Sequence, residues 1–256
     1  MRIPTVLAAW LMASTATAAA AQTCSALSGN ERVPLVELYT SEGCSSCPPA
    51  DRWLSGRMKV SDANWLAFHV DYWDDIGWLD RFAKPAFSQR QRLRVDQAGE
   101  RNVYTPQVMI GSRVGGSWQS AAAFDAALDQ ARGAAGASLG LQVERTGNGL
   151  RAMIDTQALT GSAIDATVWL AQTIDAQSTE VRAGENRGAT LHHDRVVQQL
   201  FGGWPLGAEP ARRVQDLAAI PTGAWDLVAF VQDSRGNTLQ SLRLGANRCK
   251  EIIAPP

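Results

Sequence analysis

The sequence predicts an α/β domain over residues 22–137 followed by an antiparallel β-sandwich domain over residues 138–249. In the first part, short apolar segments alternate with helical ones, which is the pattern of an α/β fold. After the small-residue linker 133–137, short strand-like segments follow one another without a convincing helix. That succession of short strands is typical of an antiparallel sandwich.

The first residues have the composition of a secretory signal peptide. Arg2 supplies a positive charge, residues 6–12 are apolar, and small residues lead up to Ala21. We expect cleavage after Ala21, removal of residues 1–21, and export to the periplasm or the cell exterior. The apolar run is shorter than the roughly 20 residues of a membrane-spanning helix, and no later segment is long and apolar enough, so we expect no membrane span.

The charge of the chain argues against a nucleic-acid partner. The formal net charge is −1 at pH 7, with 24 basic and 25 acidic side chains. Nucleic-acid binding depends on clustered lysine and arginine, and the sequence has no such excess. We therefore expect protein partners and no nucleic acid.

Four cysteines remain after cleavage, and an oxidising compartment permits disulfides between them. Four cysteines allow three connectivities. Only two residues separate Cys44 from Cys47, so we expect these two to pair, which leaves Cys24 to pair with Cys249. The second disulfide would link the ends of the mature chain, and chain entropy assigns about 5 kcal/mol to so long a loop. Two free thiols at Cys24 and Cys249 are the alternative.

The first half contains a strand that leads directly into the cysteine pair. Strand formers at 33–39 are followed by the turn residues 40–43 and then by Cys44-Ser45-Ser46-Cys47. Pro48 and Pro49 are tolerated only in the first turn of a helix, so a helix begins near the cysteines and runs towards Lys59. We further predict strands at 65–70, 107–110 and 114–116, and helices at 85–99 and from the N-cap Ser120 to Arg132.

The second half contains only short predicted strands. They lie at 139–145, 150–155, 164–173, 196–201, 225–232 and 238–244. Asn148-Gly149 between the first two is the strongest short hairpin signal. The glycine-rich segment 184–188, with His192 and His193 after it, is expected to be a plain turn, or alternatively a loop that faces the cysteine pair. Residues 250–256 are expected to form a C-terminal tail.

The strand, glycine turn, cysteine pair and helix together predict thiol–disulfide chemistry. Backbone N–H groups and the helix dipole stabilise an anion at a helix N-terminus. A thiolate at Cys44 would have a lowered pKa there and would be the attacking nucleophile. Cys47, one turn into the helix, would resolve the mixed disulfide. We therefore expect an enzyme that exchanges disulfides with protein substrates and needs no cofactor and no metal.

The order of elements, the segment 43–48 and Thr105-Pro106 before the third strand are similar to those of thioredoxin-fold proteins. The resemblance implies a thioredoxin-like first domain with a cis-proline at Pro106, and a Thr105 backbone that pairs with the substrate peptide. It also implies a buried acid that relays the proton of Cys47. Glu37 is the candidate relay, and a solvated or hydrogen-bonded strand residue is the alternative.

Two departures from thioredoxins bear on the chemistry. Ser45 and Ser46 stand between the cysteines in place of Gly-Pro, and no tryptophan precedes Cys44. Serine hydroxyls can donate hydrogen bonds to a thiolate, which predicts a more oxidising disulfide.

A closer similarity covers most of the mature chain. Segments 36–51, 69–74, 103–107 and 184–188 resemble an exported bacterial family catalogued as domain of unknown function 1223. This resemblance implies the fold and the export of the chain. It implies no reaction.

Tyr72, Trp73 and Trp78 belong to a tryptophan-rich loop after the second predicted strand. They could form the apolar wall of a substrate groove beside the cysteines. Aromatic side chains bury much area in any environment, so core packing is the alternative.

Two other functions use the same residues. Thiolates bind Cu(I), so a copper or soft-metal chaperone with His69 as a possible third ligand is one alternative. A structural zinc site is disfavoured because it normally needs four ligands and the chain has three histidines. The second alternative is a non-catalytic binding module in which the Cys44–Cys47 disulfide is inert.

Overall fold

The structure, a computed structural model, describes residues 23–115, 118–147, 149–159, 165–217 and 223–249. The expected signal peptide and C-terminal tail lie outside these residues. Within them the chain forms fourteen strands and three α-helices, with two short 3-10 turns at Asp74–Ile76 and Ala246–Arg248. The molecule is therefore mostly β.

An eight-stranded mixed sheet runs through the molecule in the order β14-β13-β8-β11-β3-β2-β4-β5. Its strands are β2 (Leu35–Thr40), β3 (Asn64–His69), β4 (Gln107–Ile110), β5 (Arg113–Val114), β8 (Ala166–Ile174), β11 (Val196–Pro205), β13 (Trp225–Asp233) and β14 (Thr238–Gly245). The β2–β3 and β3–β11 pairs are parallel, and the other described pairs of this sheet are antiparallel.

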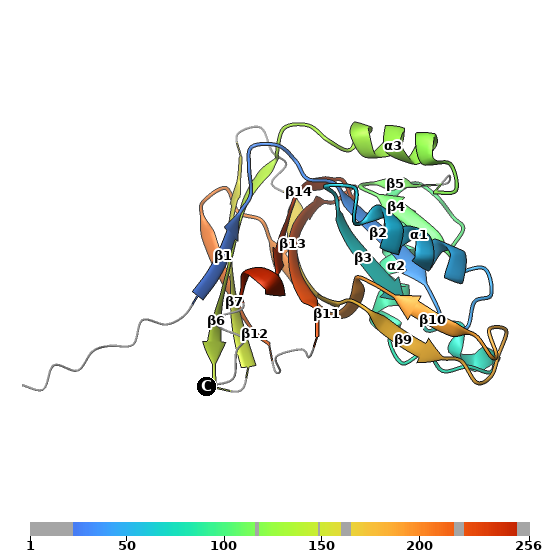
Figure 1. Ribbon diagram of the computed structural model, residues 1–256. Coiled ribbons are helices and arrows are strands. Elements are labelled where there is room, and N and C mark those ends of the chain that lie inside the picture. Colours follow the sequence, from blue (N-terminus) through green and yellow to red (C-terminus); the bar gives the residue numbers. More distant parts are fainter. Residues whose placement is uncertain (1–22, 116–117, 148, 160–164, 218–222, 250–256) are drawn as a thin grey trace, which may run out of the picture.

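The remaining elements pack against this sheet. A four-stranded antiparallel sheet has the order β1-β6-β7-β12, and β9 and β10 form a separate hairpin. Their bounds are β1 (Thr23–Leu27), β6 (Ala137–Thr146), β7 (Gly149–Ala158), β9 (Gln177–Glu180), β10 (Thr190–His193) and β12 (Ala211–Leu217), and the helices are α1 (Pro48–Arg57), α2 (Pro85–Gln97) and α3 (Ala121–Gln130). Figure 1 shows α1, α3 and the hairpin at the opposite end of the molecule from the four-stranded sheet.

The two faces of the large sheet are covered by different elements. Side chains alternate along a strand, so Val36 and Leu38 pack with α1 and α3, while Leu35 and Tyr39 pack with α2 on the other face. Val196 pairs with two residues, Ala67 and Ile174. Ala67 packs in the core under α1 and α3, and Ile174 packs in the core formed with the four-stranded sheet. Cross-strand partners share a face, so the four-stranded sheet and these two helices cover the same face.

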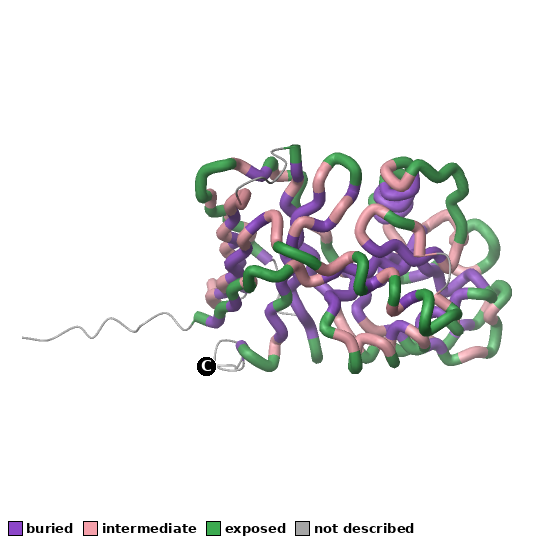
Figure 2. Tube along the Cα trace, turned by 90° about the horizontal axis from the view of Figure 1, so that it is seen from above, coloured by how far each residue is buried: buried purple, intermediate pink, exposed green. Residues whose placement is uncertain are grey.

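Strand β13 is buried on both of its faces. Leu227 and Ala229 pack in the core formed with the four-stranded sheet, and Val228 and Phe230 pack in the core under α2. The continuous apolar run of this strand follows from its central position between two covered faces. Figure 2 shows the same pattern along the chain, with buried positions in the strands and exposed positions in many of the connecting turns.

The predicted fold class, an α/β thioredoxin-like domain followed by an antiparallel β-sandwich domain, is wrong. The chain is mostly β-strands in several mixed and antiparallel sheets with few helices, and the largest sheet takes strands from both halves of the sequence. Strand β11 pairs with β3, and β1 pairs with β6. Hydrophobic alternation defines the two faces of a strand but not its neighbours, so the sequence pattern did not reveal these pairings.

A disulfide joins the first described strand to the end of the described chain. Cys24 in β1 bonds to Cys249, which follows β14, across a separation of 225 residues. Both half-cystines belong to the core between the two sheets. This is the pair that the cysteine spacing indicated.

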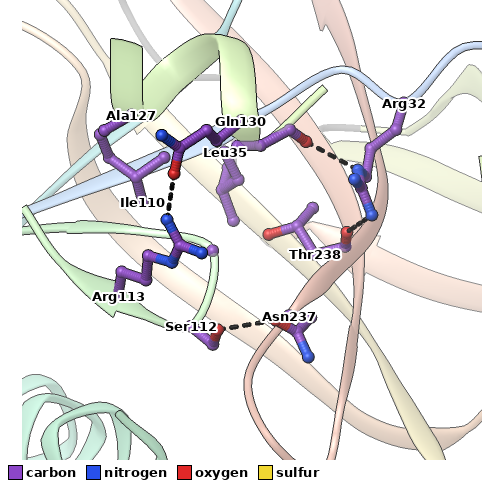
Figure 3. A pocket seen from close by; sticks show the side chains of 11 residues that line it. Arg32, Leu35, Ile110, Ser112, Arg113, Ala127, Gln130, Asn237 and Thr238 are labelled. Atoms are coloured by element: carbon purple, nitrogen blue, oxygen red, sulfur yellow. Dashed lines mark hydrogen bonds between the residues drawn. The ribbon is translucent and has the colours of Figure 1, made fainter. Parts of the chain in front are cut away.

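Arg32 closes the C-terminal end of α3. Its guanidinium donates to the carbonyl oxygens of Ala131 (2.7 Å), Arg132 (2.8 Å) and Thr238 (3.4 Å). Carbonyls in the last turn of a helix lack hydrogen-bond donors within the helix. Arg32 provides such donors and at the same time fixes α3 to β14. Figure 3 shows this contact at the rim of a pocket of about 130 Å³, where each guanidinium nitrogen of Arg32 already makes a hydrogen bond.

A buried carboxylate connects α2 to two strands of the large sheet. Glu37 is 1% exposed and accepts hydrogen bonds from Arg90 (3.0 Å), Arg94 (3.2 Å), Gln232 (3.0 Å) and Tyr39 (2.8 Å). Burial alone raises the pKa of Glu37, but the two arginines outweigh burial and lower that pKa to about 2. One ionised side chain thus holds β2, β13 and α2 together.

Replacing this carboxylate with an amide should destabilise the whole fold. Glu37→Gln leaves two buried guanidinium groups without a counter-charge, so we expect the free energy of unfolding in urea at pH 7 to fall by about 3–5 kcal/mol. The exposed Glu100 provides the control, since Glu100→Gln should change it by less than about 0.5 kcal/mol. Equal effects of the two substitutions would show that the buried pairing contributes little.

Candidate functional site

The Cys44–Cys47 disulfide lies between the end of β2 and the start of α1. Cys47 is the N-cap residue of α1 and is followed at once by a proline. Its carbonyl accepts from the backbone N–H of Ala50 (2.9 Å), while its own N–H donates to the carbonyl of Cys44 (3.2 Å). The two sulfur atoms are therefore held at the N-terminus of a helix, as the proline positions indicated.

Several residues named from the sequence gather beside this disulfide. The Thr105–Pro106 peptide bond is cis. Ser46 connects that bond to the cysteines, since its hydroxyl lies 3.3 Å from the sulfur of Cys44 and donates to the carbonyl of Thr105 at 3.4 Å. The indole N–H of Trp73 donates to the hydroxyl of Thr105 at 2.7 Å.

Trp73 also explains why residue 43 is a glycine. A Cβ atom on Gly43 would lie only 3.1 Å from the Cβ of Trp73. The turn before Cys44 thus approaches the tryptophan loop more closely than a larger residue would allow.

The three other candidate residues make different contacts. Tyr72 packs at the edge of the core under α2, and Trp78 donates to the side chain of Glu42 at 2.8 Å. Glu37 is paired with arginines of α2, as described above. Its low pKa keeps it ionised at neutral pH, so in this arrangement it has no proton to give. A relay role for Glu37 stays a prediction.

Both cysteines are completely buried, at 0% exposure, although Ser45 and Ser46 between them are exposed. The segment 181–189 between β9 and β10, which we call the covering loop, lies against the turn that carries Cys44. Its Asn186 donates to the carbonyls of Glu42 (2.8 Å) and Cys44 (3.0 Å). This loop, which the sequence analysis expected to be a plain turn, faces the cysteine pair.

A second residue of the covering loop meets the same turn. The backbone N–H of Ser45 donates to the carboxylate of Glu185 at 3.1 Å. Hydrogen bonds with the side chain and the backbone N–H of Ser45 lower the pKa of Glu185. The covering loop thus places an anion at the N-terminal approach to α1.

A buried cluster of charges lies behind the cysteine turn. His193 of β10 stands between Glu42, 3.4 Å away, and Asp51 of α1, 3.5 Å away. Burial would lower the pKa of His193, but the two carboxylates outweigh it and raise the pKa to about 9. At neutral pH the histidine is therefore a cation that ties β10 to α1 and to the turn before Cys44.

The cluster continues to a second histidine. Asp80 accepts from the backbone N–H of Glu42 (2.9 Å) and pairs with the imidazole of His69 at 2.6 Å. The rings of His69 and His193 meet edge to face with centroids 4.9 Å apart. His69, the possible third copper ligand, is thus engaged with Asp80.

From the sequence, Glu42, Asp51 and Asp80 had no assigned role, and His193 was only part of a segment that could face the cysteine pair. No motif identifies them, because they come from a turn, a helix, a loop and a distant strand. The only available signal was the position of Glu42 two residues before Cys44.

Within the part of the chain that the structure describes, no three histidine, cysteine, aspartate or glutamate side chains are arranged to hold a metal ion. No helix among the same residues is long and apolar enough to cross a membrane. The two disulfides are consistent with an extracellular protein.

Comparison with known proteins identifies one family and two similar folds. A family model described as a protein of unknown function (DUF1223) matches residues 35–232. The crystal structure of protein AGR_C_4864 from Agrobacterium tumefaciens has a TM-score of 0.63 and 22% identity, covering 83% of this chain and 94% of that one. HBP35 of Porphyromonas gingivalis has a TM-score of 0.62 and 12% identity, covering 84% and 76%. At these identities the two structures show a shared fold alone. No curated protein matches the chain significantly.

The charge of His193 should stabilise the protein only below alkaline pH. A raised pKa gives a contribution that is complete below about 6.5, declines as pH rises, and is lost above about 9. We expect His193→Gln to lower the free energy of unfolding by about 2–3 kcal/mol at pH 6 and by much less at pH 10.

The neighbouring His192 is exposed on the same strand and supplies the matched control. His192→Gln should have little effect at either pH. Urea unfolding of the three proteins at pH 6, 8 and 10 measures the difference. A pH-independent loss in His193→Gln would contradict a charged histidine in this cluster.

Proposed function

Because the chain belongs to the DUF1223 family, whose description assigns no reaction, we propose its function from the site itself: exchange of disulfides with protein substrates through Cys44 and Cys47 in an exported compartment. The observation that carries the proposal is the disulfide at the N-terminus of α1, in contact through Ser46 with the Thr105–Pro106 segment. A helix N-terminus stabilises a thiolate, and the thiolate is the reactive form of cysteine.

The reaction has two steps in the reducing direction. The thiolate of Cys44 attacks one sulfur of a substrate disulfide, forms a mixed disulfide, and releases the other substrate sulfur as a thiolate. Cys47, after losing its proton to water, attacks the sulfur of Cys44 and displaces the first substrate sulfur. The substrate disulfide is thereby reduced to two thiols, and the Cys44–Cys47 pair is oxidised. The reverse sequence oxidises a substrate dithiol.

The surroundings of Cys44 supply groups suited to these steps. The Ser46 hydroxyl at 3.3 Å can donate a hydrogen bond to the thiolate sulfur. Thr105 presents its backbone at the same position, and its side chain is fixed by Trp73. In this proposal Thr105 aligns the substrate backbone, Pro106 shapes the groove, and Trp73 forms part of its wall.

Burial of both cysteines sets a condition on the reaction, because a substrate sulfur must reach Cys44. The covering loop therefore has to move away from the turn at 42–45. Three hydrogen bonds connect it to that turn, and the two from Asn186 contribute on the order of 1 kcal/mol each. Opening on this scale leaves a populated minority of molecules in which the disulfide is accessible.

The same burial favours a second candidate, a non-catalytic protein in which the disulfide only fixes the turn between β2 and α1. In that case Cys44 remains unreactive after reduction. The copper-chaperone alternative has no comparable support, since His69 is paired with Asp80.

A resolving-cysteine variant separates the two candidates. Cys47→Ser leaves Cys44 unable to complete the second step, so we expect substrates to accumulate as mixed disulfides on Cys44. The variant is expressed with its leader in an oxidising compartment, and adducts are identified by mass spectrometry after acid quenching.

Cys44→Ser is the matched control, because it retains one cysteine at the site but removes the proposed nucleophile. It should trap at least tenfold less substrate. If Cys47→Ser traps no more than Cys44→Ser, the exchange reaction is refuted and the inert disulfide is favoured.

A further inference from the structure

The covering loop makes its closest polar contacts with the backbone around Cys44. We propose that Glu185 and Asn186 are positioning residues that close the covering loop over the Cys44–Cys47 pair and favour its disulfide form. This inference rests on the proposed exchange function, for which the stability of the disulfide sets the direction of the reaction.

Asn186 holds the peptide groups on either side of the turn. Its amide nitrogen donates to the carbonyl oxygens of Glu42 and Cys44, at 2.8 and 3.0 Å. The Cys44 carbonyl also accepts from the N–H of Cys47. Asn186 therefore stabilises the backbone arrangement that brings Cys44 and Cys47 together.

Glu185 acts through its charge. Its carboxylate accepts from the N–H of Ser45, directly after Cys44, at 3.1 Å. That position is the positive approach to α1, which would also stabilise a Cys44 thiolate. A carboxylate held at the residue next to Cys44 repels a thiolate on Cys44, whereas the disulfide is neutral and meets no such repulsion.

The other carboxylates around the turn have histidine partners. Glu42 and Asp51 flank the cationic His193, and Asp80 pairs with His69. Among the described residues, Glu185 forms no ion pair with a cationic side chain, and it meets the turn through Ser45. The negative charge of a reduced Cys44 therefore acts first on the contact between Glu185 and Ser45.

The loop approaches the site closely because of a glycine. Gly184 has a φ of +71°, and a Cβ atom there would lie 3.1 Å from the Cβ of Trp78. This approach places the next two residues, Glu185 and Asn186, against the cysteine turn.

Closure and redox state are therefore coupled. If the closed loop favours the disulfide, then by thermodynamic reciprocity the disulfide favours the closed loop, and reduction releases it. Variants that weaken closure should make the Cys44–Cys47 disulfide easier to reduce.

The test is a redox titration of the purified full mature chain. Protein is equilibrated with mixtures of reduced and oxidised dithiothreitol, quenched with acid and alkylated, and the oxidised fraction of each cysteine pair is measured by mass spectrometry. The variants are Asn186→Ala, Glu185→Gln and the double substitution. In each single variant we expect the equilibrium constant for reduction of Cys44–Cys47 to rise about three- to tenfold, with a larger rise in the double variant.

Two controls accompany the titration. Arg187→Gln changes a charge in the same loop but removes none of the three hydrogen bonds to the turn, so its equilibrium constant should equal that of wild type. The Cys24–Cys249 pair reports the integrity of the fold in the same samples, and its oxidised fraction should be equal in all the proteins.

The outcomes distinguish this inference from the proposed function. Equal reduction of Cys44–Cys47 in wild type, Glu185→Gln and Asn186→Ala would overturn the role of the loop and leave exchange possible. Resistance in wild type, with reduction only in the double variant, would support the loop and contradict exchange by the native protein. Resistance in every variant would contradict both.

Discussion

The site depends on the pairing of β11 with β3, which joins the two halves of the chain in one sheet. The N–H of Ala67 in β3 donates to the carbonyl of Arg195 at 2.8 Å, and Val196 lies beside Ala67 in parallel register. Arg195 is fixed in turn by ion pairs with Asp175 and Asp226. Because β10 ends two residues before Arg195, this pairing also carries the β9–β10 hairpin onto α1 and the cysteine turn. The candidate site is consequently built from both halves of the sequence.

Two buried glutamates, Glu37 and Glu42, have different roles because they face different cationic partners. Glu37 faces two arginines of α2 and holds the sheet to that helix, at a distance in sequence from the cysteines. Glu42 is buried in the turn itself and faces His193, so any change in the position of the hairpin alters its only cationic partner within the described cluster. Removing one member of a buried ion pair leaves an uncompensated charge, which costs several kcal/mol. The first pair therefore secures the fold, and the second secures the hairpin.

Local features were predictable from the sequence, and non-local ones were not. Paired prolines indicated where α1 begins, and Ser120 indicated the start of α3, where its hydroxyl accepts from the N–H of Ala123 at 3.4 Å. Spacing indicated both disulfides. The order of strands in the sheet could not be predicted, because the side chains of β3 alternate between its two faces in the same way whether its edge is free or paired with β11. The contact of the covering loop with the cysteine turn could not be predicted for a related reason. Asn186 lies 142 residues from Cys44, and its amide group forms no recognisable motif.

A buried disulfide is compatible with exchange because the hairpin has a firm base and a lightly held tip. At the base, His193 is locked between Asp51 and Glu42, and the N–H groups of Val181 and Gly188 donate to Ala189 and Val181 across the loop. Breaking the buried ion pairs would cost several kcal/mol. At the tip, one hydrogen bond to the exposed Glu185 and two from Asn186 hold the loop on the turn, and the two from Asn186 contribute on the order of 1 kcal/mol each. Lifting the tip while the base stays in place is therefore the least costly way to expose Cys44. Such a movement breaks none of the strand pairings of β3 and β11.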